Sequence, residues 1–149
     1  MMTNQENTQK YENYRIQSNR LKKAMDNYFY LEAVFIEYAI MEDRLTSILR
    51  YENNSINSKK HVSIDKKINK VRMISQEKKG LAGKYFSDTF LDSLHQWKEK
   101  RNPYIHSLMK LQLSSDNLKE LAVEGNELQR ELCKLSQKYK RAVERSKQP

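Results

Sequence analysis

The chain has 149 residues, of which 38% are hydrophobic and 32% are charged, with only 3 Gly and 2 Pro. This length suits one domain with its own core, and the scarcity of helix breakers favours long helices over strands. The sequence contains no apolar run of about 18 residues that would cross a membrane, and its polar start lacks the apolar core of a secretion signal. We therefore expect a cytoplasmic protein without membrane segments. The single cysteine, Cys133, excludes an internal disulfide and a cysteine-based zinc site.

Positive charge is distributed unevenly along the chain. The formal net charge is +9, and residues 59–84 hold nine Lys or Arg against two acids. Residues 134–149 hold six bases and one acid. Such basic segments suit a polyanion such as RNA, although a solvated lysine-rich surface that only aids solubility explains them equally well.

The spacing of apolar residues predicts an all-α, single-domain antiparallel bundle of four or five helices over residues 10–149. Residues 1–9 are polar and are expected to be disordered. Helices are predicted at about 10–27, 28–51 and 64–78, from 88 towards residue 106, and from 115 onwards. Ser63 and Ser87 are suitable N-caps, residues 52–62 are predicted to form a loop, and Gly80 and Gly83 mark a turn.

The predicted helix 28–51 has apolar side chains on two sides. Its wide face is expected to pack within the protomer, and a narrower stripe is expected to contribute to a dimer. The stripe consists of Phe29, Ala33, Ile36 and Ile40. Glu42 falls within the apolar seam, where an unpaired carboxylate would cost several kcal/mol, and we name Arg101 as its hypothetical partner. In the alternative interpretation, Glu42 lies in water at the rim.

Residues 101–106, with the sequence Arg-Asn-Pro-Tyr-Ile-His, set an arginine, an amide and a histidine at fixed spacing. Pro103 has no N–H and crowds the preceding turn, so a break is expected, with Asn102 as the N-cap of a new helix. A helix start would offer free N–H groups to a phosphate. On an unbroken helix, His106 would lie about 140° away from Arg101. In the alternative interpretation, these are ordinary surface polar residues beside a helix break.

The arrangement Arg-Asn-x-x-x-His, present at Arg101, Asn102 and His106, resembles the motif of the HEPN superfamily (higher eukaryotes and prokaryotes nucleotide-binding). This resemblance implies an HEPN-like helical bundle that forms a homodimer and joins two motifs across the subunit boundary. Many HEPN proteins are metal-independent endoribonucleases of toxin–antitoxin, abortive-infection or CRISPR systems, which implies an RNA substrate and, for a toxin or phage-defence effector, a cognate antitoxin. Other members bind nucleotides or proteins without cleaving RNA, and such a non-catalytic module is the alternative. A plain helical interaction protein with an accidental motif is a third hypothesis.

RNA cleavage without a metal or cofactor moves the proton of a ribose 2′-OH and stabilises charge on phosphorus. Histidine suits the proton transfer, and arginine matches the phosphate oxygens with a permanently charged fork. Asn102 can hold the phosphate or the histidine ring. Because acid and base catalysis needs two groups and one protomer supplies one motif histidine, a paired site across a two-fold axis is expected. The expected products are a 2′,3′-cyclic phosphate and a 5′-OH.

Further residues near the motif are candidate contributors. Lysines that flank the motif are expected to contact RNA: Lys98, Lys100 and Lys110. Tyr104 is a candidate for base stacking and His95 for support, although a helix-face aromatic is more often part of the core and a helical histidine is more often simply exposed. A metal site at His95 and His106 is not expected, because these residues lack the i, i+4 spacing and nearby carboxylates of a helical zinc site.

Overall fold

The computed structural model describes residues 3–52, 62–77, 81–106, 108–110 and 115–148. Over these ranges the protein is all-α as predicted, with six helices and no strand, whereas four or five helices were expected. The helices are α1 (Asn4–Asp26), α2 (Tyr30–Tyr51), α3 (Ile64–Gln76), α4 (Ala82–Tyr85), α5 (Asp88–His106) and α6 (Ser115–Ser146). None of these described helices is both long enough and apolar enough to cross a bilayer.

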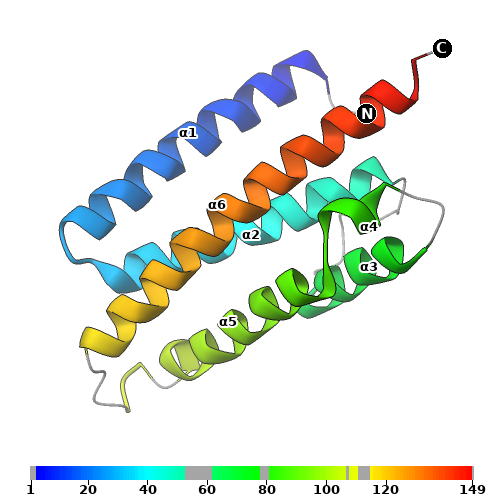
Figure 1. Ribbon diagram of the computed structural model, residues 1–149. Helices are drawn as coiled ribbons and strands as arrows, with labels where there is room; N and C mark the ends of the chain where they lie inside the picture. The colour runs from blue at the N-terminus through cyan, green and yellow to red at the C-terminus, as the bar shows by residue number, and fades with distance from the viewer. Residues whose placement is uncertain (1–2, 53–61, 78–80, 107, 111–114, 149) are drawn as a thin grey trace.

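Helices α2 and α6 pack along one another at the centre of the molecule (Figure 1). They run in the same direction, from the lower left to the upper right of Figure 1, whereas α1 and α5 run the opposite way. Helix α1 packs against α2, α5 packs against α6, and α3 contacts both α2 and α5. The end of α5 and the end of α6 therefore lie at opposite ends of the bundle.

Side-chain caps set the starts of three helices. The Ser63 Oγ accepts the Lys66 N–H (3.3 Å) and the Ser87 Oγ accepts the Phe90 N–H (3.2 Å), which confirms both predicted N-caps. Helix α1 begins at Asn4, six residues earlier than predicted, because Thr3 and Glu6 form a capping box that satisfies the first free N–H groups. Residues 4–9 of the segment that was expected to be disordered belong to helix α1. Residues 53–61 of the predicted loop and Gly80 lie outside the described residues.

Glycines at two positions allow neighbouring groups to approach a helix closely. A Cβ at Gly83 would lie 2.5 Å from the Ser75 carbonyl oxygen, so Gly83 belongs to the contact between α4 and α3 rather than to a turn. A Cβ at Gly125 would lie 2.4 Å from the Glu37 Oε1 and 2.6 Å from the Trp97 Cζ2. Helix α6 continues unbroken through Gly125, which leaves a notch on its surface for these two side chains.

The two apolar sides of α2 differ from the prediction. On the narrow stripe, Ala33 and Ile40 are buried within the protomer, and Phe29 is exposed. On the wide face, Phe35 is 46% exposed, whereas residues further along the same face, such as Met41 and Leu45, are buried. Two of the four stripe residues are therefore buried within the protomer, and the exposed side chain of Phe35 lies beside Arg101.

Candidate active site

Helix α5 continues through Pro103 to His106, so the predicted break at Asn102 is wrong. Pro103 is exposed and lies in the last turn, where its missing N–H removes one backbone hydrogen bond just before the helix ends. Asn102 is consequently inside the helix and is not an N-cap. The motif lies at the negative, C-terminal end of the helix dipole, so a phosphate would have to be held by side chains rather than by free N–H groups.

The Arg101 side chain is packed between α5 and α2. Its guanidinium carbon lies 3.8 Å from the centroid of the Tyr38 ring and 6.0 Å from that of Phe35, and its Nη1 donates to the Asn102 Oδ1 (3.2 Å). Burial lowers the pKa of Arg101, and the nearby Tyr38 and Glu42 oppose that change. An arginine remains a cation under such a shift. The ring of Tyr38 and the amide of Asn102 therefore hold a permanent charge in a defined position.

His106 is exposed at the end of α5. Since the helix is unbroken, His106 and Arg101 project in directions about 140° apart. Asn102 contacts the arginine of its own chain, and no hydrogen bond or ion pair among the described residues joins Arg101 to His106. One chain therefore places the three motif residues within the last two turns of α5 without bringing the guanidinium and the imidazole together.

Glu42 is paired with a residue that the sequence did not indicate. Its Oε1 accepts a hydrogen bond from the Lys67 Nζ at 3.1 Å, and no ion pair joins it to Arg101 in the described part of the chain. The Glu42 side chain is 29% exposed, at the edge of the core. The hypothetical pair of Glu42 and Arg101 is thus not formed, and Glu42 acts on Arg101 only through space, by favouring its charged form.

His95 lies beside two carboxylates that the sequence analysis did not expect there. Its Nδ1 is 3.0 Å from the Asp65 Oδ1 of α3, and its Nε2 is 3.7 Å from the Glu99 Oε1 one turn further along α5. Ligand atoms of the three residues lie within 4.8 Å of one another, close enough to share a metal ion. The Lys98 ammonium, however, already contacts both carboxylates, and a metal ion would have to displace it.

The residues predicted to support the motif differ in exposure. Lys98 is only 7% exposed and is bound to Asp65 and Glu99, so its predicted contact with RNA does not fit this arrangement. Lys100 is open to solvent and pairs with Glu124 of α6 at 3.1 Å. Lys110 is exposed. Tyr104 is half-buried and packs against the core, which agrees with the alternative that a helix-face aromatic belongs to the core.

Glu37 is the buried acid of the site region, and the sequence analysis missed it. Its side chain is fully buried, neither carboxyl oxygen has a hydrogen-bond partner among the described residues, and burial raises its pKa to about 9. It lies in the notch over Gly125 together with Trp97, whose Nε1–H donates to the Leu121 carbonyl at 2.9 Å. Spacing from Ala33 and Met41 would have placed Glu37 on the buried side of α2, and the isolated glycine in α6 was the second available signal.

Comparison of the chain with protein-family models, with curated proteins and with solved structures gives no match. What the structure itself shows, over the described residues, is an all-helical protein with an Arg-Asn-x-x-x-His motif in the last turns of α5. Its resemblance to HEPN proteins rests on that motif.

Proposed function

We propose that the protein is a metal-independent endoribonuclease of HEPN type that acts as a homodimer. The observation that carries this proposal is the fixed position of Arg101, which the Tyr38 ring and the Asn102 amide hold five residues before an exposed histidine. A guanidinium with a defined position is suited to an oligonucleotide phosphate, and the imidazole of His106 is accessible for proton transfer. The net charge of +9 favours association with RNA.

A second copy of the chain supplies what one copy lacks. Because Arg101 and His106 project about 140° apart on one helix, groups from two chains can surround a phosphate more easily than groups from one. One His106 accepts the proton of the 2′-OH while the 2′ oxygen attacks phosphorus. The P–O5′ bond breaks, and the second His106 protonates the departing 5′ oxygen. The two Arg101 side chains stabilise the charge on the phosphoryl oxygens.

The proposed role is that of a toxin or phage-defence effector in the cytoplasm, controlled by a cognate antitoxin. This role follows from the resemblance to HEPN proteins and from the RNA-cleaving chemistry proposed above.

The test is cleavage of single-stranded RNA by the purified protein in EDTA. We expect a 2′,3′-cyclic phosphate product, and we expect His106→Ala to reduce the rate by about 100-fold or more, as is usual for loss of a general acid–base group. Met109→Ala changes an exposed residue near the motif and serves as the control. Unchanged cleavage by His106→Ala, or a monomeric protein in light scattering, would contradict the proposal.

The packing of Arg101 favours a second candidate, a non-catalytic module that binds a nucleotide or another protein. The guanidinium lies over Tyr38 and close to the exposed ring of Phe35, so its contacts with α2 also have a purely structural explanation. In this case Arg101→Ala lowers the melting temperature, whereas His106→Ala changes neither stability nor any RNA cleavage. A protein that binds its ligand but leaves RNA intact would select this candidate.

A further inference from the structure

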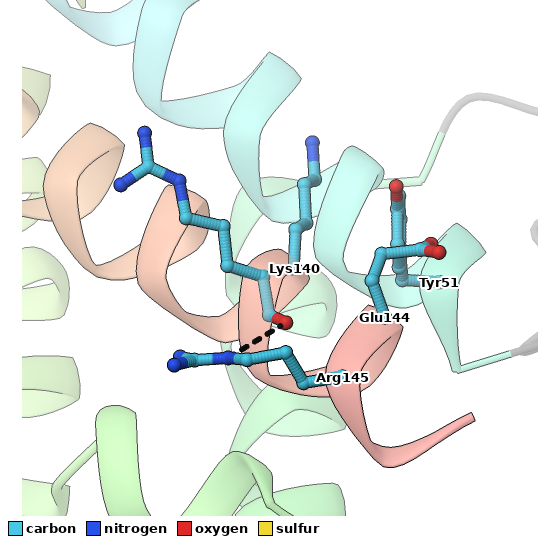
Figure 2. Close-up of a pocket in the computed structure, with 5 residues that line it drawn as sticks. Tyr51, Lys140, Glu144 and Arg145 are labelled. Carbon is cyan, nitrogen blue, oxygen red and sulfur yellow. Dashed lines mark hydrogen bonds between the residues drawn. The ribbon is translucent and has the colours of Figure 1, made fainter. Parts of the chain in front are cut away.

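A basic hollow of about 640 Å³ is lined by residues of the C-terminal parts of α2 and α6 (Figure 2). These parts lie at the opposite end of the bundle from the end of α5 (Figure 1). Its lining contains three cationic side chains, one acid and one aromatic ring: Lys140, Arg141, Arg145, Glu144 and Tyr51. The Arg145 Nε donates to the Arg141 carbonyl oxygen at 3.4 Å (Figure 2). The cations of this hollow therefore outnumber its acids.

Lys140 is the residue of the hollow whose charged group is held in place by other side chains. Its Nζ donates to the Ser47 Oγ (2.6 Å) and lies 5.1 Å from the centroid of the Tyr51 ring. Two residues of α2 thus fix the ammonium in place. Among the described residues, no carboxylate lies within ion-pair distance of Lys140, Arg141 or Arg145. A half-buried ammonium that contacts only a hydroxyl and an aromatic ring would be stabilised by a nearby anion.

Neighbouring positive charges also disfavour the ammonium form of Lys140. Burial, with Arg44 and Lys10 nearby, lowers the pKa of Lys140 to about 8, and Asp43 and Cys133 act in the opposite direction. Asp43 is already shared by Lys10, at 3.2 Å, and by Arg44. Asp43, the carboxylate that opposes this shift, is therefore already paired with two other cations. An anion that entered the hollow would relieve repulsion among residues of α1, α2 and α6.

We propose that this hollow binds a phosphate group through Lys140, Arg141 and Arg145. The phosphate can belong to a free oligophosphate or to a nucleic-acid backbone, which share the charge and the oxygen geometry that a guanidinium recognises. The site is separate from the motif. Glu124 of α6 pairs with Lys100, next to the motif on α5. Lys140 lies sixteen residues after Glu124 on the same helix, which corresponds to about 24 Å along its axis. Binding here is independent of whether the protein cleaves RNA.

The experiment titrates the protein with tripolyphosphate and, separately, with a single-stranded deoxyoligonucleotide, which has no 2′-OH and cannot be cleaved by the proposed chemistry. The test variant is Arg141→Gln/Arg145→Gln, and the matched control is Lys134→Gln/Lys138→Gln, the same charge change at exposed i, i+4 positions of α6. We expect the test variant to weaken binding by about 10-fold or more and the control by no more than about 2-fold. Binding of tripolyphosphate identifies a free oligophosphate site, and binding of the oligonucleotide alone identifies a backbone site.

Two results would overturn the proposal. Absence of saturable binding of either ligand at low salt would show that the cations only complement the negative ends of α2 and α6. Equal weakening by the two double variants would show that the ligand responds to net charge and not to the hollow. Because all four substituted residues are exposed, a folding defect is not expected, and thermal melting of each variant verifies this.

Proton uptake provides a second readout that non-specific screening would not produce. Near pH 8 about half of the Lys140 side chains are neutral, and an anion beside the ammonium favours the protonated form. Calorimetry with the deoxyoligonucleotide, whose phosphodiesters do not titrate in this range, in buffers of different ionisation enthalpy should therefore detect proton uptake on binding at pH 8 and almost none at pH 6. The same uptake at both pH values, or none at pH 8, would contradict a phosphate placed beside Lys140.

Discussion

Two glutamates on α2, five residues apart, have opposite environments. Glu42 lies at the edge of the core, and its carboxylate is 3.1 Å from the Lys67 ammonium. Glu37 is fully buried, neither of its oxygens has a hydrogen-bond partner in the part of the chain that the structure describes, and burial raises its pKa to about 9. A carboxyl group with a cation beside it keeps its charge, whereas one without a partner keeps its proton. The two acids therefore contribute to this protein in different ways.

The protonated carboxyl group of Glu37 occupies the notch between α2, α5 and α6. Its oxygen and the Trp97 ring both occupy the space that a side chain at Gly125 would take. Trp97 precedes Arg101 by one helical turn, so the packing of this notch helps to set the position of the motif end of α5. Glu42, in contrast, contributes a charge at the surface of the same region.

The largest effect is expected for Gly125→Ala. On an exposed helix this change stabilises by about 1 kcal/mol, but here the new Cβ would meet Glu37 Oε1 at 2.4 Å and the Trp97 ring at 2.6 Å. We expect a loss of about 3 kcal/mol or more in the free energy of unfolding, measured by urea denaturation, with an altered Trp97 fluorescence. Glu127→Ala, at an exposed position of the same helix, is the control. A stabilised Gly125→Ala protein would mean that the notch is not filled by these groups.

The next effect is the pH dependence that Glu37 imposes. Its carboxyl group ionises near pH 4.5 in the unfolded chain but only near pH 9 in the folded protein, so between these values the unfolded state binds fewer protons and stability falls as pH rises. At pH 7 the difference amounts to about 3 kcal/mol. Glu37→Gln, which cannot ionise, should therefore be more stable than the wild type by about that amount at pH 7 and should match it near pH 4.

Chemical denaturation of both proteins from pH 4 to pH 9 provides the measurement. Glu42→Gln in the same series is the matched control, because its ionised carboxylate has a partner in the folded state. Parallel stability curves for the wild type and Glu37→Gln would show that Glu37 is ionised in the folded protein, in contact with a cation.

Local signals in the sequence were sufficient for most of the helices. Apolar spacing and a serine cap define α3, and the same signals define the start of α5, because capping and amphipathicity depend on neighbours along the chain. Helix α1 begins before its first apolar residues, because the capping box of Thr3 and Glu6 sets its start. Pro103 does not end α5 at Asn102, since in the last turn of a helix proline removes only one hydrogen bond.

The candidate site was predictable in its residue types but not in its contacts. The motif identified Arg101, Asn102 and His106, and the structure shows how the first two are held. It was not possible to predict that Tyr38 stacks on Arg101 or that Lys67 pairs with Glu42, because both contacts join different helices. The position of the buried acid likewise depends on which helix lies opposite α2. Partners across helices follow from packing, which one sequence does not specify residue by residue.

The smallest effect is expected for Glu42→Gln. This change removes the charge from a pair in which the Lys67 side chain is only 9% exposed and the Glu42 side chain 29% exposed. A partly solvated ion pair contributes about 1 kcal/mol, so we expect a loss of that size in the free energy of unfolding, in contrast with the gain from Glu37→Gln at the same pH. Because Glu42 also favours the charged form of Arg101 through space, RNA cleavage should fall only slightly. A loss of activity comparable with that of His106→Ala would instead assign Glu42 a direct role in holding Arg101, and a gain in stability would remove the distinction between the two acids.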